Sequence, residues 1–131
     1  RFVTKYRFED FSVVTTFNAE PAPIDYKSHK LARRYKTIIT ESVDFGPNFA
    51  GHYRFVSWGC GTCCEQSAIV DLRDGKVYEG LGSGCGYKVN IQSRMILVAP
   101  PDDSGYWNGS APCHPYIYIW SEENKKVEQI E

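Results

Sequence analysis

The chain has 131 residues, of which 15 are basic and 16 acidic, and its formal net charge is −1. This is the length of one ordinary domain, so we treat residues 1–131 as a single domain. A balanced charge does not suggest a nucleic-acid partner, which favours a basic stripe, and no apolar run approaches the about 18 residues of a membrane-spanning helix. The chain begins at Arg1 with neither a methionine nor the apolar segment of a signal peptide, which fits a processed or trimmed chain.

The first third of the chain predicts one strand, a linker and one helix. Residues 8–15 alternate loosely between apolar and polar side chains, which predicts a strand. The prolines at 21 and 23 mark residues 18–25 as a linker. Residues 28–43 predict a helix that Ser28 caps, with an apolar face formed by Leu31, Tyr35, Ile38 and Ile39. We interpret its basic residues as a solvated face, the alternative being contact with an anionic partner.

A cysteine-rich hairpin follows the helix and organises the rest of the prediction. Residues 52–58 and 67–72 are rich in aromatic and β-branched side chains and predict two strands, with residues 59–64 as the loop between them. The Asp74-Gly75 pair predicts a tight turn. Further strands are predicted at 77–81, 87–91, 95–99, 116–120 and 127–130. The expected fold class is α+β, an antiparallel β-sheet meander of about seven to eight strands with one N-terminal helix packed on it.

Five cysteines in a small domain indicate disulfides if the compartment is oxidising. We favour Cys60–Cys64 across the hairpin loop and Cys85–Cys113 between the glycine-rich connection and the long loop, with Cys63 unpaired. A cross-link over so short a loop contributes only about 2 kcal/mol, so its purpose would be rigidity. The pairings Cys63–Cys85 and Cys64–Cys113 stay open, because sequence alone does not fix connectivity.

A metal site is the first alternative use of these cysteines. It would combine Cys60 and Cys63 with Cys85, Cys113 or His114. Structural zinc sites usually show two close ligand pairs, and here only one exists, so neither a metal nor any other cofactor is predicted.

A cysteine enzyme is the second alternative. It would use Cys63 or Cys64 as the nucleophile and His52 or His114 as the base, since a thiolate needs a nearby imidazole for activation. No local spacing supplies such a pair, so no catalytic residue is predicted.

Contact with another protein is the use we favour. Residues 100–114 are long for a hairpin connection, and long loops are disproportionately functional. Tyrosine and tryptophan are the usual anchors of protein interfaces. The predicted contact residues are Trp58, Gly61, Thr62, Tyr106 and Trp107.

Five short motifs carry a resemblance to a known family: Ala32-Arg33-Arg34-Tyr35, Gly46-Pro47-Asn48-Phe49-Ala50-Gly51-His52-Tyr53, Trp58-Gly59-Cys60-Gly61-Thr62, Ala68-Ile69-Val70-Asp71 and Gly75-Lys76-Val77-Tyr78. With these the chain resembles a family of small, uncharacterised exported bacterial proteins. The resemblance implies a periplasmic or secreted protein and carries no activity. It also implies a cysteine at the position of Cys64, which supports the Cys60–Cys64 pairing and makes Cys63 an additional thiol.

The layout of two strands joined by a short two-cysteine loop is also similar to that of bacterial periplasmic inhibitors of vertebrate lysozyme, whose loop enters the enzyme's cleft. The loop here lacks their charged and histidine residues. Together these features predict a small exported, disulfide-containing binding module, an inhibitor or immunity-type protein that acts on another protein.

Overall fold

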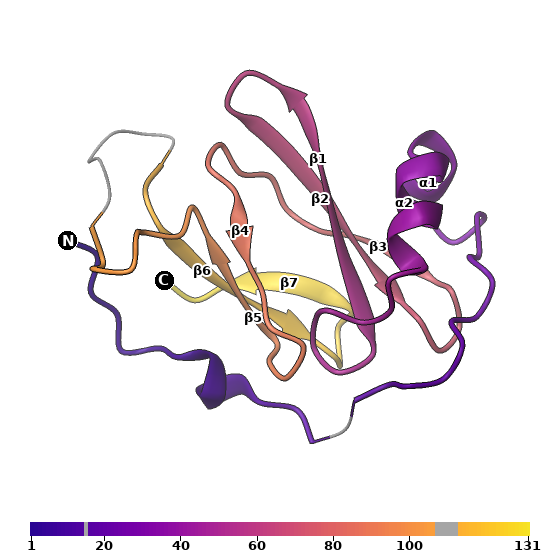
Figure 1. Cartoon of the computed structure of the whole chain (residues 1–131), viewed down its shortest axis with the longest axis horizontal. Coiled ribbons are helices and arrows are strands. Elements are labelled where there is room, and N and C mark those ends of the chain that lie inside the picture. The colour runs from indigo at the N-terminus through magenta and orange to yellow at the C-terminus, as the bar shows by residue number, and fades with distance from the viewer. Residues whose placement is uncertain (15, 107–112) are drawn as a thin grey trace.

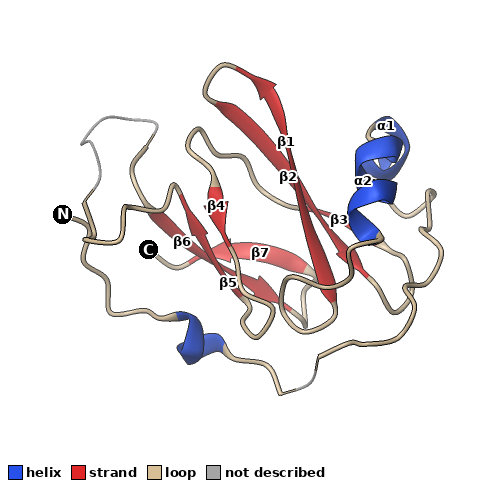
Figure 2. Ribbon diagram, viewed as in Figure 1, coloured by secondary structure: helices blue, strands red, loops and turns tan. Residues whose placement is uncertain are grey.

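The computed structural model describes residues 1–14, 16–106 and 113–131, and within them the strands form two antiparallel sheets (Figures 1 and 2). The first sheet has the order β1-β2-β3 and the second the order β4-β5-β6-β7. The strands are β1 (Tyr53–Gly61), β2 (Cys64–Asp71), β3 (Val77–Glu79), β4 (Tyr87–Lys88), β5 (Met95–Val98), β6 (Tyr116–Ser121) and β7 (Lys126–Gln129). The α+β class and the antiparallel pairing are therefore confirmed, whereas the single meander is wrong.

Both faces of the β1–β2 hairpin are apolar, which explains why the strands form two packed sheets and not a single meander. One face is apolar through Val56, Trp58, Ala68 and Val70, and it packs against the helices. The opposite face carries Tyr53, Phe55 and Ile69, and it packs against Ile96, Val98 and Trp120 of the second sheet. A hairpin that is apolar on both faces needs cover on both. The first sheet is therefore the middle layer between the helices and the second sheet.

The predicted helix is present but divided. Helix α1 spans Lys30–Arg34 and α2 spans Lys36–Val43, with Tyr35 between them at φ −114° and ψ 37°. The cap is His29, whose Nδ1 accepts a hydrogen bond from the Leu31 amide at 3.0 Å. Ser28, the predicted cap, instead accepts a hydrogen bond from the Val77 amide in β3 at 2.9 Å.

The N-terminal part of the chain corrects two further expectations. The helix is not N-terminal, because an extended segment precedes it and runs past the second sheet along one side of the molecule (Figure 1). The strand predicted at 8–15 does not form over the described residues 8–14: a 3₁₀ helix spans Phe8–Phe11, and only an isolated bridge joins Ser12 to Ser93. Beyond that helix the segment forms hydrogen bonds with the turn at 90–94, for example from the Val13 amide to the Gln92 carbonyl at 2.9 Å. It therefore crosses a turn instead of extending a sheet. None of the described helices is long and apolar enough to cross a membrane.

Candidate binding surface

The tip of the β1–β2 hairpin projects beyond the rest of the molecule (Figure 1). The strands pair from Tyr53↔Asp71 at the base to Gly61↔Cys64 at the tip, with Thr62 and Cys63 as the turn. Residues 59–63 are all exposed. Two backbone angles are unusual, since φ is 131° at Gly61 and 52° at Cys63. Glycine adopts such angles readily and other residues rarely do, so the turn depends on Gly61.

The predicted disulfide crosses this tip. Cys60 is bonded to Cys64, with their Cα atoms 5.1 Å apart, and the strand register shifts between Gly59 and Gly61. The second predicted bond, Cys85–Cys113, is also present, and Cys63 is the exposed free thiol. The favoured connectivity is thus confirmed. The disulfide therefore joins the two strands at the point where the shift in register interrupts their regular backbone pairing.

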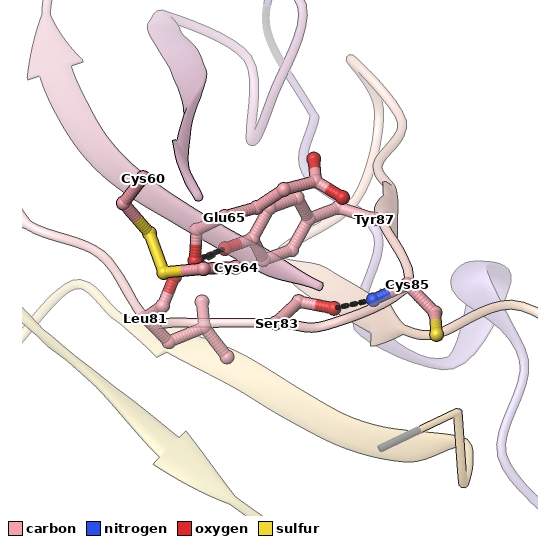
Figure 3. Close-up of a disulfide and its surroundings, with 7 residues drawn as sticks. All are labelled: Cys60, Cys64, Glu65, Leu81, Ser83, Cys85 and Tyr87. Carbon is pink, nitrogen blue, oxygen red and sulfur yellow. Dashed lines mark hydrogen bonds between the residues drawn. A yellow bond between two sulfur atoms is a disulfide. The ribbon is translucent and has the colours of Figure 1, made fainter. Parts of the chain in front are cut away.

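The tip is held to the body at its base on both faces. On one face the Trp58 ring is only 8 % exposed and lies 4.4 Å from the Tyr35 ring between the two helices. On the other, the Tyr87 hydroxyl donates to the Glu65 carbonyl at 3.2 Å and to the Leu81 carbonyl at 2.5 Å (Figure 3). Burial raises the pKa of Tyr87 to about 12, so this donor keeps its proton at physiological pH.

This packing separates the predicted contact residues. Gly61 and Thr62 are exposed at the tip, whereas Trp58 is a core residue that anchors the hairpin and offers little surface. Tyr106 is 60 % exposed. The Phe2 amide donates to the carbonyl of Gly105, the residue before Tyr106, at 2.7 Å. This bond places Tyr106 beside the N-terminus of the chain, which Figure 1 shows apart from the tip of the β1–β2 hairpin. Trp107 lies outside the described residues.

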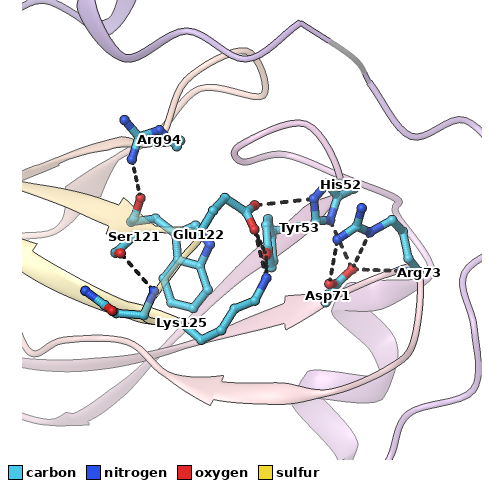
Figure 4. Close-up of polar contacts among 10 residues, drawn as sticks. His52, Tyr53, Asp71, Arg73, Arg94, Ser121, Glu122 and Lys125 are labelled. Atoms are coloured by element: carbon cyan, nitrogen blue, oxygen red, sulfur yellow. Dashed lines mark hydrogen bonds and ion pairs between the residues drawn. The ribbon is translucent and has the colours of Figure 1, made fainter.

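A polar cluster that the sequence did not predict lies at the other end of the hairpin (Figure 4). His52 Nδ1 is 3.0 Å from Asp71 Oδ1, and His52 Nε2 is 3.4 Å from Glu122 Oε1 in the turn between β6 and β7. Arg73 also contacts the Asp71 carboxylate, at 3.4 Å. Burial alone would raise the pKa of Asp71, but the hydrogen bonds from Arg73 and the His52 charge hold it below its usual value.

The same cluster continues to the second sheet. The Tyr53 hydroxyl donates to Glu122 Oε2 at 2.9 Å, and Lys125 Nζ donates to Tyr53 Oη at 3.1 Å and to Glu122 Oε2 at 2.8 Å. Burial would raise the pKa of Glu122, but the Lys125 and Tyr53 hydrogen bonds outweigh it and lower that pKa. Burial raises the pKa of Tyr53 to about 12. The cluster links the base of the first sheet to the second through charged side chains, and no sequence motif marks these distant partners.

The geometry does not assemble the cysteine–histidine pair at His52 that the alternative, a cysteine enzyme, would need. Strand β1 is nine residues long, and at about 3.3 Å per residue it separates His52 from Cys63 by about 30 Å. Both ring nitrogens of His52 face carboxylates, and Cys64 is in a disulfide. His114 lies outside this cluster, with its ring 4.8 Å from that of Tyr116. Across the described residues, no group of three or more histidine, cysteine, aspartate or glutamate side chains is placed to hold a metal ion.

Comparisons of the chain with models of protein families, with curated proteins and with solved structures found no match. The structure itself defines the class as an α+β protein with two disulfides, in which helices, a three-stranded sheet and a four-stranded sheet form successive layers.

Proposed function

We propose that this protein is a small exported binding module that acts on another protein through the Cys60–Cys64 hairpin tip. The observation that carries the proposal is the combination of projection and rigidity. Residues 59–63 are exposed at the end of the two longest strands, and a disulfide closes them. A surface that is ordered before it binds loses less conformational entropy on association. A projecting, pre-ordered tip of this kind suits insertion into a partner's cleft, and inhibition is the expected outcome.

The proposed compartment is periplasmic or extracellular. Disulfides persist in oxidising compartments and are rare in the cytosol. Two disulfides in a chain of 131 residues fit such a compartment. The resemblance to exported bacterial proteins, whose motifs include Cys60, supports the same proposal.

The proposal is tested by site-specific photocrosslinking. A photoreactive amino acid replaces Thr62 at the tip, and in a matched control it replaces Glu123, which is exposed in the β6–β7 turn at the opposite end of the hairpin. Both proteins are incubated with the extracytoplasmic fraction of the source organism and with that of organisms that share its habitat. We expect one partner to crosslink from position 62 and not from 123, and its enzymatic activity to fall when the unmodified protein is added. Identical crosslinks from both positions, or none from position 62, would contradict the proposal.

A further inference from the structure

The outer edge of β1 is covered only along its first half. The Tyr53 amide donates to the Phe49 carbonyl at 3.0 Å, and the amides of Asn48 and Phe49 donate to the Tyr53 carbonyl at 3.0 and 3.1 Å. Two residues further along, the Asn48 side chain accepts from the Phe55 amide at 2.6 Å and donates to the Phe55 carbonyl at 3.1 Å. Asn48 thus occupies the place of a neighbouring strand. The backbone groups of Tyr53 and Phe55 therefore point away from β2.

The second half of this edge is open. In an antiparallel strand the backbone groups alternate between the two sides, so Ser57 and Gly59 point outward like Tyr53 and Phe55. Among the described residues, none forms a hydrogen bond with these outward groups. Both residues are exposed, and a Cβ atom added to Gly59 would meet nothing within 4 Å. An exposed strand edge with unpaired amides and carbonyls is a template for an incoming strand.

A groove of about 450 Å³ adjoins this edge at Ser57. It is lined by Ser42, Asn48, Arg54, Phe55, Ser57, Glu65, Gly86, Tyr87 and Val89. The groove therefore reaches from the end of α2 past β1 to β4, so an extended segment lying in it contacts the β1 edge and side chains from both layers.

The charged side chains that line this groove are Arg54 and Glu65, and neither forms an ion pair within the described part of the chain. The Nε of Arg54 donates to Ser42 Oγ at 3.0 Å, its Nη1 donates to the Gly46 carbonyl at 3.4 Å, and its guanidinium lies 5.7 Å from the centre of the Phe45 ring. Burial lowers the pKa of Arg54. A half-buried guanidinium with neutral partners is suited to a carboxylate brought by a ligand.

We propose that the partner contributes an extended acidic segment, which pairs with the outer edge of β1 at Ser57 and Gly59 and places a carboxylate on Arg54. The inference rests on the proposed function and names the chemistry by which the hairpin recognises its partner. Ser57 is three positions beyond Arg54, about 10 Å along the strand, so the carboxylate lies within about three residues of the paired backbone. Glu65 lines the same groove and disfavours a second acidic residue beside it.

The test uses three blocked heptapeptides of alternating threonine and valine, with glutamate, glutamine or lysine at the centre, and measures binding by fluorescence anisotropy. We expect the glutamate peptide to bind about tenfold more tightly than the glutamine peptide, the size of one charge-assisted hydrogen bond. Arg54→Gln should abolish this preference, and Arg54→Lys should retain part of it. Ser57→Pro should weaken the binding of all three peptides, because proline lacks the outward-facing amide. Ser57→Val keeps that amide and serves as the matched control.

Amide resonances provide a second readout that does not depend on the proline variant folding. The amides of Ser57 and Gly59 should shift when the glutamate peptide binds the unmodified protein. Equal affinity for the glutamate and lysine peptides, unchanged binding by a folded Ser57→Pro variant, or no binding of any peptide at millimolar concentration would overturn the inference. If a partner crosslinks from position 62 and its capture survives both Ser57→Pro and Arg54→Gln, the proposed function stands and this inference fails. If the peptides bind as expected without a crosslink from position 62, only the proposed function fails.

Discussion

The two ends of the β1–β2 hairpin are built in opposite ways. At the base, His52 and Asp71 meet Glu122 in a charged cluster that connects the two sheets. At the tip, a disulfide between the exposed Cys60 and the partly buried Cys64 takes the place of such contacts. The comparison shows that one pair of strands can be part of the packed core at one end and form an exposed, accessible surface at the other. Stability should therefore depend on the base and on the anchoring Trp58, whereas binding should depend on the tip and the open edge of β1.

Trp58→Ala gives the largest expected loss of stability. The ring is buried against Tyr35, so its removal leaves a cavity beneath the helices. Such truncations cost about 3–5 kcal/mol, which urea unfolding followed by far-UV circular dichroism would measure. Thr62→Ala, the matched change at the exposed tip, should alter stability by less than about 0.5 kcal/mol. If Trp58→Ala lowered the free energy of unfolding only slightly, Trp58 would not be an anchor of the hairpin. It would again be a candidate contact residue, as the sequence predicted.

Asp71→Asn should have the next largest effect. The Asp71 side chain is buried and contacts both His52 and Arg73, so the amide removes the counter-charge of Arg73 and alters the hydrogen bond with the His52 ring. We expect a loss of about 2 kcal/mol in urea unfolding, the cost of weakening a buried charge-assisted network. Asp74→Asn, in the exposed turn that follows, is the control. Equal stability of the two variants would show that the base of the hairpin is not held by this cluster.

Acid should weaken the same cluster more gradually. The folded-state pKa values of Asp71 and Glu122 are lowered, because the hydrogen bonds and charges of their neighbours outweigh burial. A carboxylate with a lowered folded pKa contributes stability above its unfolded pKa, which is about 4, and loses it as pH falls through the folded value. The urea concentration at which half of the protein is unfolded should therefore decrease as the pH is lowered below about 4. Asp71→Asn should show a flatter pH profile, and a parallel profile would contradict the assignment.

Removal of the tip disulfide should cost little global stability. The double substitution Cys60→Ser with Cys64→Ser should lower the free energy of unfolding by no more than about 2 kcal/mol, because the closed loop is short. Amide hydrogen exchange should rise at residues 59–65 and stay unchanged at the base. A loss of protection that reaches Asp71 would show that the tip supports the whole hairpin.

The smallest effect on stability is expected at Cys63. Its thiol is exposed and outside both disulfides. Intact mass after alkylation without reductant should show one modified cysteine, and peptide mapping should place it at position 63. Cys63→Ser should leave the thermal midpoint unchanged and remove that label. Labelling of two or more cysteines in the native protein would contradict the disulfide assignment.

Local sequence patterns predicted the parts of this protein that depend on neighbouring residues. The aromatic and β-branched run at 52–58, the apolar run at 67–72 and the Asp74-Gly75 turn yielded the central hairpin and the β3 return. The short spacing of Cys60 and Cys64 favoured the bond between them, which the structure contains, but spacing alone left Cys63–Cys85 and Cys64–Cys113 open. Turn chemistry and strand propensity act over a few residues, so a sequence displays them directly.

Tertiary structure alone decided which surfaces were free. Trp58 has the chemistry of an interface anchor, but helix packing places it in the core. Glu122 is far from His52 in sequence, so only sheet packing brings the two within 3.4 Å. The coverage of β1 by Asn48 and the open backbone at Ser57 are likewise consequences of which segments pack beside the strand. Burial and long-range pairing are properties of the assembled layers, and a residue's type does not specify which neighbour covers it.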